Sequence, residues 1–281
     1  VSYHNITTSF VRGKWGNSDK CKTSMLLAKC CHDMDIMMWM MSPVRPVSVS
    51  SVGSLGQFKR ENAPENSGTY CLKDCPNVDT CQYSAKKIYL DHLGSWEFYV
   101  WQELESVENP TMEQRIELLK RSPYGKCVYK CDNNVVDHQS VAVQFRSGAT
   151  GTHNMVGGSA EPRRNIHIVG TKGEIFGNFE ESKFTVLKVN PSPEAHNGEC
   201  DVEVVDLRVS GDMVGAYGGH GGGDEGIVAD MYEYLNGIYT GCSVSEISTS
   251  VANHLIGFAA EEARHNDTVV SMDEYNEKYG F

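Results

Sequence analysis

The segment from Met25 to Met41, MLLAKCCHDMDIMMWMM, decides how the rest of this sequence is organised. Many of its apolar residues recur at helical spacing and form one stripe, which comprises Leu27, Cys30, Cys31, Met34, Met37, Met38 and Met41. The opposite side also carries bulky apolar residues, namely Ile36, Trp39 and Met40. The segment therefore predicts a mostly apolar helix, with Ser24 as its N-cap and Ser42-Pro43 at its end.

The same segment carries polar residues that an apolar helix does not need, namely Lys29, His32, Asp33 and Asp35. Charged groups among apolar side chains are costly unless they are paired or used. At about 100° per residue, His32 lies about 60° from Asp35, so the two side chains can meet. An imidazole beside carboxylates indicates a proton-transfer site. The alternative is a buried, hydrogen-bonded histidine that holds the helix in place.

Length, charge and cysteine content exclude several classes of protein. The chain has 281 residues and a net charge of −12, which argues against nucleic acid and anionic membrane surfaces as partners. No apolar run has transmembrane length and no signal peptide is visible, so we expect a soluble, cytoplasmic protein. For a long chain without a secretory signal, the ten cysteines favour thiols or metal ligands over disulfides.

The order of the predicted elements indicates an α+β fold. Besides the organising helix, the sequence predicts helices over 84–92, 111–121, 225–235 and 245–264. Strands are predicted over 2–12, 44–58, 140–145, 151–156, 163–169, 173–179, 184–189 and 202–209. Consecutive strands favour a large, mostly antiparallel, open-faced sheet with helices on one face. We expect one domain over residues 1–281, with a cysteine-rich insertion at about 59–138.

Short loops bring several of the cysteines close together in the sequence. Cys71, Cys75 and Cys81 have the spacing C-x3-C-x5-C, and Cys127 begins a C-x3-C pair with Cys131. Thiolates grouped in this way can hold a tetrahedral zinc ion or an iron–sulfur cluster. The candidate ligands are Cys71, Cys75, Cys81 and Cys127, and plain free thiols are the alternative.

A glycine-rich segment, GAYGGHGGGDEG, precedes a predicted helix and contains His220 and Asp224. Glycines let a ligand approach the backbone and a helix N-terminus offers free N–H groups, which favours a binding loop. The alternative is a connector in which Asp224 caps the helix. Trp15, Asn17 and Arg163 are further candidates for lining a polar pocket, although a packed tryptophan and a strand-edge arginine are their ordinary roles.

Several of these motifs together resemble the glucose–fructose oxidoreductase, inositol dehydrogenase and rhizopine-catabolism (Gfo/Idh/MocA) family. They are AKCCHDMDIMMWM, SFVRGKW, FKRENAP, CPNVDTCQYSA, PYGKCVYKCDNNVVDHQ, GTKGEIFG, GHGGGDEG and HLIGFAAEEAR. The resemblance covers only the family's second, C-terminal domain. The Rossmann domain that precedes it in family members is not in this sequence, so we expect a fragment that is inactive by itself.

The resemblance implies hydride transfer between NAD or NADP and a hydroxyl-bearing carbon of a sugar or cyclitol. His32 would exchange the hydroxyl proton, Asp35 would orient His32, and Lys29 would bias its charge. The implied substrate contacts are Trp15, Asn17, Asp33, Arg163, His220 and Asp224. Many members have an aspartate four residues before the histidine, where this chain has Ala28.

The resemblance also implies a homo-oligomer, because the sheet domain of this family commonly makes subunit contacts. Two alternatives to the dehydrogenase remain open from the sequence. One is a relative that uses NAD transiently to cleave a glycoside. The other is a non-catalytic binding module stabilised by a structural metal such as zinc.

Overall fold

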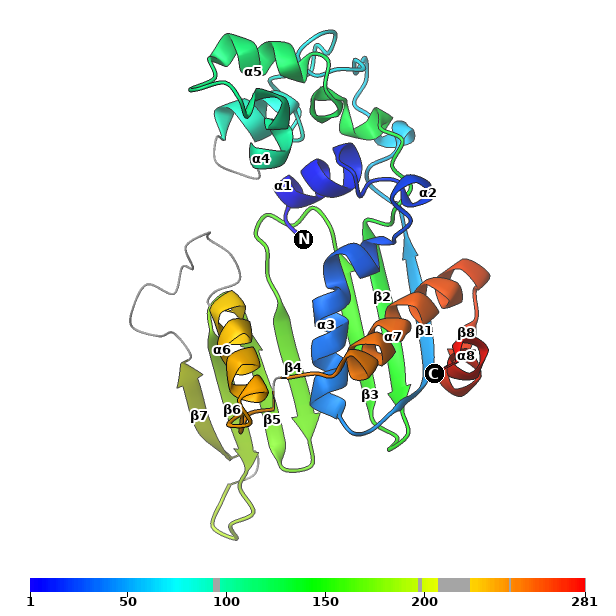
Figure 1. Ribbon diagram of the computed structural model, residues 1–281, viewed down its shortest axis with the longest axis vertical. Helices are drawn as coiled ribbons and strands as arrows, with labels where there is room; N and C mark the ends of the chain where they lie inside the picture. The colour runs from blue at the N-terminus through cyan, green and yellow to red at the C-terminus, as the bar shows by residue number, and fades with distance from the viewer. Residues whose placement is uncertain (93–96, 197–198, 207–222, 243, 281) are drawn as a thin grey trace. The chain divides into compact units, whose positions relative to one another are not determined.

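The computed structural model describes residues 1–92, 97–196, 199–206, 223–242 and 244–280. The chain divides into two compact units, Val1–Glu161 with Ile247–Phe281, and Pro162–Glu246. Each unit is built on its own antiparallel sheet (Figure 1). The fold is therefore α+β with open antiparallel sheets, as the sequence predicts. The expectation that residues 1–281 act as one domain stays a prediction.

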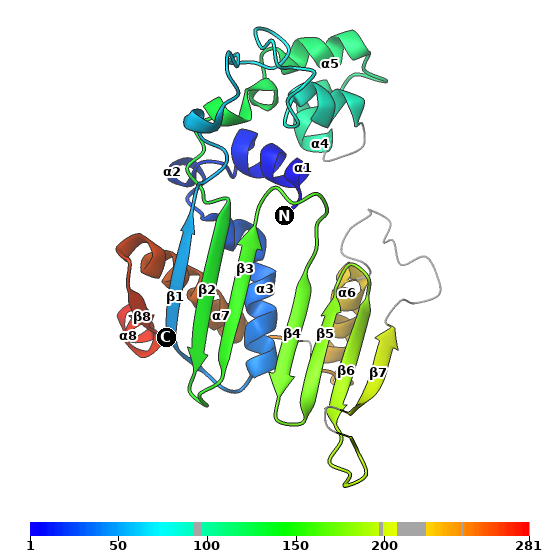
Figure 2. The same cartoon turned by 180° about the vertical axis from the view of Figure 1, so that it is seen from behind.

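The first unit contains a four-stranded antiparallel sheet in the order β3-β2-β1-β8. Its strands are β1 (Pro46–Ser54), β2 (His138–Phe145), β3 (Thr150–Val156) and β8 (Val269–Ser271). Along β2 every second side chain is buried, from Gln139 to Phe145, so one face of the sheet lies in the core. Helices α3 (Met25–Met41) and α7 (Ile247–Asn266) cover that face, as Figures 1 and 2 show from opposite sides.

Helix α3 begins where the sequence predicts, because the Ser24 hydroxyl accepts a hydrogen bond from the backbone N–H of Leu27 at 3.2 Å. Its buried side is displaced from the predicted stripe. The buried residues are Met25, Leu26, Cys30, Met34 and Met38, whereas the predicted Leu27, Cys31, Met37 and Met41 are half-buried. Helix α3 packs against two partners, the sheet and α7, and these contacts decide which of its residues are buried. A single apolar stripe in the sequence does not predict contacts on two sides.

Helix α7 packs against α3 through small residues. Its buried residues include Gly257, Ala259, Ala260 and Ala263, whereas Phe258 is 51% exposed. A Cβ atom at Gly257 would lie only 2.6 Å from Cδ2 of Leu27. Small side chains therefore allow the two helices to approach closely, and a bulky residue at Gly257 would separate them.

The predicted strand over residues 2–12 is wrong. This segment forms α1 (Tyr3–Asn5) and then a π-helical stretch over Ile6–Arg12, with Ile6, Phe10 and Val11 buried. Its β-branched and aromatic residues favour a strand locally, but the spacing of the buried residues fits one side of a helix packed on the core. Tertiary packing overrides the local preference here.

The cysteine-rich insertion of the first unit consists of short helices and loops around a second apolar cluster that includes Tyr89, Trp101 and Leu118. The prediction over 111–121 is confirmed by α5 (Met112–Leu119), where Thr111 and Gln114 form a capping box. The segment predicted as a helix over 84–92 contains a π-helical turn, Lys87–Asp91. The remaining short helices of the unit are α2 (Ser18–Cys21), α4 (Glu97–Val100), α8 (Met272–Tyr279) and single 3-10 turns at Arg60–Asn62, Gln102–Leu104, Pro123–Gly125 and Val128–Lys130.

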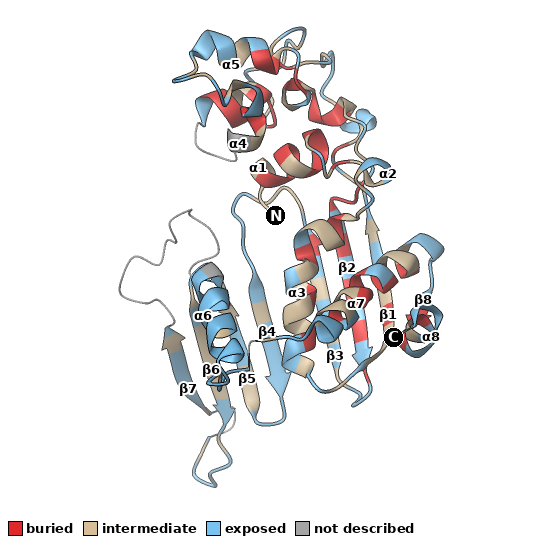
Figure 3. Ribbon diagram, in the orientation of Figure 1, coloured by how far each residue is buried: buried red, intermediate tan, exposed pale blue. Residues whose placement is uncertain are grey.

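The second unit has strands in the order β4-β5-β6-β7, joined as successive antiparallel neighbours. They are β4 (Asn165–Gly170), β5 (Gly173–Asn178), β6 (Lys183–Val189) and β7 (Cys200–Asp206), close to the predicted ranges, although residues 207–209 lie outside the described residues. Helix α6 (Gly223–Leu235) begins one residue before the predicted cap, and nearly all of its described residues are exposed (Figure 3). In the described part of the chain, no helix has the length and apolarity needed to span a membrane.

Gly125 offers a direct test of packing in the insertion. A Cβ atom there would lie 1.6 Å from the carbonyl oxygen of Leu119, at the end of α5. We expect Gly125→Ala to lower the free energy of unfolding by at least about 2 kcal/mol, because the backbone must move to relieve the overlap. Urea unfolding followed by circular dichroism measures the change. In the control Gly226→Ala, nothing lies within 4 Å of the new Cβ in α6, and equal losses in the two variants would contradict the packing described here.

Candidate functional site

The organising helix presents His32 to solvent. The His32 side chain is exposed, and among the described residues it makes no hydrogen bond or ion pair. The predicted contact between His32 and Asp35 is therefore not formed as a hydrogen bond, although both residues lie on α3. An exposed imidazole without a partner among the described residues is accessible to a bound molecule.

Asp35 is held by a residue that the sequence analysis did not single out. The Nδ2 of Asn253, a buried residue of α7, donates a hydrogen bond to Oδ1 of Asp35 at 2.6 Å. A short bond from a neutral amide to a carboxylate fixes the carboxylate without cancelling its charge. Asp35 is half-buried, so the bond also links α3 to α7 at the edge of their packed surface.

Asp33 pairs with a second unpredicted residue, His153 of β3. The Oδ2 of Asp33 lies 3.4 Å from Nε2 of His153, and both side chains are largely covered. The other ring nitrogen of His153, Nδ1, is buried and has no hydrogen-bond partner within the described residues. His153 lies beneath α3 on the same side of β3 as the buried Met155, because alternate residues of a strand share a face.

Cys30 completes a compact group with these two residues. The ligand atoms of Cys30, Asp33 and His153 all lie within 4.8 Å of one another, an arrangement compatible with a metal ion. Burial, and then the neighbouring Asp33 carboxylate, raises the pKa of the Cys30 thiol to about 12. Cys30 is therefore a neutral thiol near pH 7, and the group forms a polar patch under the helix that carries His32.

Trp15 and Asn17 have local partners. The Nζ of Lys14 lies 4.6 Å from the centre of the half-buried Trp15 ring. Asn17 caps α2 by accepting hydrogen bonds from the backbone N–H groups of Asp19 and Lys20, and its Nδ2 donates to the carbonyl of Asp132 at 2.7 Å. These bonds hold the loop before α3, and a substrate role for either residue stays a prediction.

The remaining predicted residues are not gathered around His32 by any described contact. Lys29 lies exposed on α3, and Arg163 is exposed in the second unit. His220 and the side chain of Asp224 lie outside the described residues. Their predicted contacts with a substrate stay predictions.

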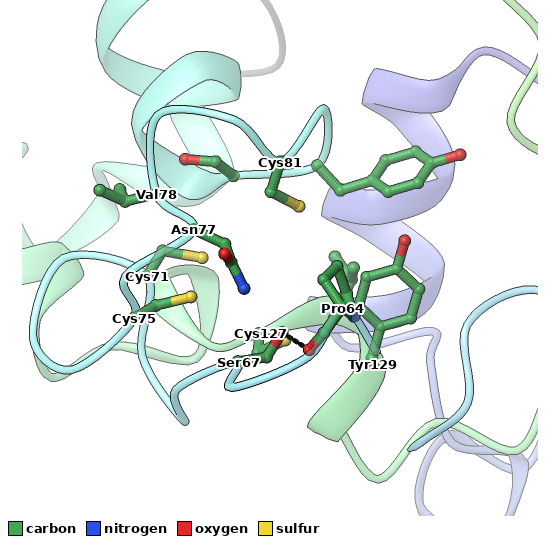
Figure 4. A pocket seen from close by; sticks show the side chains of 12 residues that line it. Pro64, Ser67, Cys71, Cys75, Asn77, Val78, Cys81, Cys127 and Tyr129 are labelled. Atoms are coloured by element: carbon green, nitrogen blue, oxygen red, sulfur yellow. Dashed lines mark hydrogen bonds between the residues drawn. The ribbon is translucent and has the colours of Figure 1, made fainter. Parts of the chain in front are cut away.

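The four predicted metal ligands do come together. Cys71, Cys75, Cys81 and Cys127 line one small pocket of the first unit, and Figure 4 shows the sulfurs of Cys71, Cys75 and Cys81 directed into it. None of the ten cysteines forms a disulfide in the described structure. The four cysteines therefore line the same pocket, and metal binding by them stays a prediction.

Comparison with known proteins places this fold in a family. A sequence model described as "Oxidoreductase family, C-terminal alpha/beta domain" matches residues 1–199. The chain belongs to the Gfo/Idh/MocA family. The match is to the C-terminal domain of that family, as the sequence motifs predict. A comparison with curated protein sequences finds no match.

Solved structures support the same fold at low sequence identity. An oxidoreductase domain protein from Kribbella flavida is 14% identical with a TM-score of 0.53, and the match covers 92% of this chain and 54% of that one. A levoglucosan dehydrogenase solved with NADH and levoglucosan is 13% identical with a TM-score of 0.51, over 96% of this chain and 56% of that one. The chain thus spans about half the length of these relatives.

The state of Cys30 can be tested by its reactivity. Because its thiol is buried and its pKa is raised to about 12, we expect iodoacetamide at about pH 8 to modify Cys30 at least ~100-fold more slowly than the exposed Cys242. Timed alkylation followed by peptide mass spectrometry measures both rates in one sample, and urea-unfolded protein provides the control. Comparable rates in the folded protein would show that Cys30 is accessible and ionised.

Proposed function

We propose that this chain is the substrate-binding half of an NAD(P)-dependent oxidoreductase that acts on the CH–OH group of a sugar or cyclitol. The observation that carries the proposal is an exposed His32 on a helix whose adjacent carboxylates are held from below by Asn253 and His153. Membership of the Gfo/Idh/MocA family supplies the reaction class. The levoglucosan dehydrogenase structures with NADH support a nicotinamide cofactor and a sugar-like substrate.

The residues of this chain account for the proton in that reaction. When a hydroxyl-bearing carbon is oxidised, the hydroxyl oxygen loses a proton, and His32 is placed to accept it. Asp35, fixed by Asn253, supplies a carboxylate on the same helix. Asp33, held by His153, adds a second carboxylate. In the reverse direction His32 returns the proton to the developing alkoxide.

Hydride exchange would be supplied by a bound nicotinamide nucleotide. The described residues show no built cradle for its phosphates, so we assign nucleotide binding to a domain outside this sequence. Solved relatives about twice as long as the chain are consistent with such a domain. We accordingly expect the 281-residue chain to be inactive by itself.

The complete protein that contains this chain provides the test of the proposed function. We expect it to bind NADH or NADPH by fluorescence titration and to oxidise at least one member of a panel of sugars and cyclitols. His32→Asn should lower kcat by about 10²- to 10⁴-fold, the usual contribution of a general acid–base group. Nucleotide binding should be unchanged.

The matched control is His265→Asn, an exposed histidine at the end of α7, which should retain full activity. Absence of nicotinamide binding, or equal activity of His32→Asn and the native protein, would overturn the proposal. Release of a chromogenic aglycone from a glycoside, without net change in NADH, would instead assign the glycosidase reaction.

We also propose that the protein is a homo-oligomer that associates through the sheet of the second unit. One face of this sheet carries exposed apolar side chains on four strands: Val169, Phe176, Val189, Val202 and Val204. They share a face because Phe176 pairs with Thr185 and Thr185 with Val204, while Val169, Val189 and Val202 lie an even number of residues along their strands from the same row. Contiguous exposed apolar surface is typical of interaction sites, and the family resemblance favours a second copy as the occupant.

Charged substitutions on that face test the association. We expect Val204→Glu to reduce the mass of the native particle measured by light scattering to that of a smaller species, because a buried carboxylate at an interface is costly. Thr171→Glu, in the exposed β4–β5 turn, is the control and should leave the mass unchanged. A monomeric native protein, or an unchanged mass for Val204→Glu, would contradict the proposed interface.

A further inference from the structure

Four thiols reach the small pocket of the insertion from segments that are far apart in the sequence. Cys71 and Cys75 lie in one loop, Cys81 closes the next turn, and Cys127 arrives from a segment 46 residues further along. We infer that these cysteines bind one Zn²⁺ as a tetrathiolate, and that the buried Arg12 balances its charge. A metal at this position would have a structural role, separate from the proton chemistry at His32.

Backbone hydrogen bonds fix the segments that carry these thiols. The backbone N–H of Cys71 donates to the carbonyl of Gly125 at 2.9 Å, and that of Cys127 donates to the carbonyl of Thr69 at 2.9 Å. The carboxylate of Asp74 accepts two backbone N–H bonds, from Thr69 at 2.9 Å and Tyr70 at 2.7 Å. The two cysteine segments are thus joined side by side, which directs their side chains to a common point.

Arg12 lies beside this pocket as a buried cation without a carboxylate partner among the described residues. Its Nε donates to the carbonyl of Lys126 at 2.8 Å and its Nη2 to that of Tyr83 at 2.7 Å. The same Nη2 lies 3.8 Å from Sγ of Cys71, while Nη1 is buried and has no hydrogen-bond acceptor in the described part of the chain.

The charge of Arg12 points to an anionic centre at the thiols. A guanidinium remains protonated in proteins, and an isolated buried charge is strongly unfavourable. Four neutral thiols would leave that charge with neutral partners alone, namely two backbone carbonyls and the Tyr89 ring, whose centre lies 5.6 Å from Cζ of Arg12. A zinc ion with four thiolates has a net charge of −2, because the four negative sulfurs outweigh the divalent cation. The zinc site therefore provides the counterion that Arg12 lacks.

The size of the pocket favours a single ion. It has space for about one water-sized sphere, whereas an iron–sulfur cluster needs room for several atoms. In the described chain, however, only the Cys30 group has three ligand atoms all within 4.8 Å of one another. Four sulfurs around zinc at about 2.3 Å lie closer than that, so we expect zinc to draw the thiols inward by side-chain rotation.

Cys131 is the natural control within the same region. It follows Cys127 by four residues and is also shielded from solvent, but its Sγ lies 3.3 Å from the carbonyl of Cys127, and it does not line the pocket. Its thiol is thus occupied by a local contact. The four-ligand assignment excludes Cys131 although the C-x3-C spacing pairs it with Cys127.

The experiment measures metal content in the full 281-residue chain. The protein is expressed in zinc-supplemented medium, purified without chelators and analysed by inductively coupled plasma mass spectrometry. We expect one zinc per chain, retained by Cys131→Ser and reduced at least tenfold in Cys75→Ser and Cys81→Ser. Replacement of zinc by Co²⁺ in the native chain should give the intense thiolate-to-cobalt absorption of a tetrathiolate site.

Substitution of the cation tests the charge argument. Arg12→Gln should lose zinc at least tenfold faster than the native chain to a colorimetric chelator, and Arg12→Lys should restore part of the retention because it restores the charge. Circular dichroism establishes that each variant is folded. If the Arg12 variants do not fold, the zinc content and cobalt spectrum of the native chain still decide the proposal.

Three results would overturn it. The first is a native chain that carries no zinc and has all four thiols freely alkylated, and the second is a native chain that carries iron with acid-labile sulfide. The third is loss of the metal from Cys131→Ser together with its retention by Cys81→Ser. None of these measurements depends on nicotinamide binding or turnover, so the zinc site and the oxidoreductase activity can fail independently.

Discussion

The close approach of α3 and α7 over one face of a sheet is the constraint on which the first unit depends. Gly257 of α7 has no side chain at this contact, and Leu27 of α3 fills the space that a larger residue would need. This packing buries Cys30, Met34 and Met38 on one side of α3. It also brings Asn253 to within 2.6 Å of Asp35. Apolar contact and polar orientation are therefore produced by the same helix pair.

Polar groups around α3 are sorted by depth. His32 faces solvent, Asp33 and Asp35 are half-buried, and Cys30 is enclosed. Each carboxylate is met by one residue from another element, His153 from β3 or Asn253 from α7. Such outer contacts restrict side-chain motion before any substrate arrives, which is how a site on a rigid helix gains precision. The proposed proton transfer is therefore assigned to the exposed His32 side chain.

Helix caps and residue alternation in the sequence predict much of this fold. Contacts between elements far apart in the sequence produce no comparable pattern. Ser24 and Thr111 mark helix starts that the structure confirms, and alternating residues mark the strands. The segment over 2–12 fails because β-branched residues favour a strand locally while its core contacts require a helix. Asn253 and His153 lie on other elements than α3, so no spacing within the helix could reveal them. The sequence did offer one signal for His153: it is a titratable residue on the inward-facing side of the predicted strand 151–156.

The first unit consists of two chain segments, one before and one after the second unit in the sequence, because residues 162–246 interrupt it between β3 and α7. During synthesis on the ribosome, β1 and α3 emerge long before the helix and strand that complete their core. Until α7 and β8 appear, the part of the apolar sheet face that α7 covers and one edge of β1 have no partner. The nascent chain must therefore carry an incomplete core through the translation of about 85 residues. We therefore expect this chain order to affect the dependence of folding on chaperones more than the stability of the folded protein.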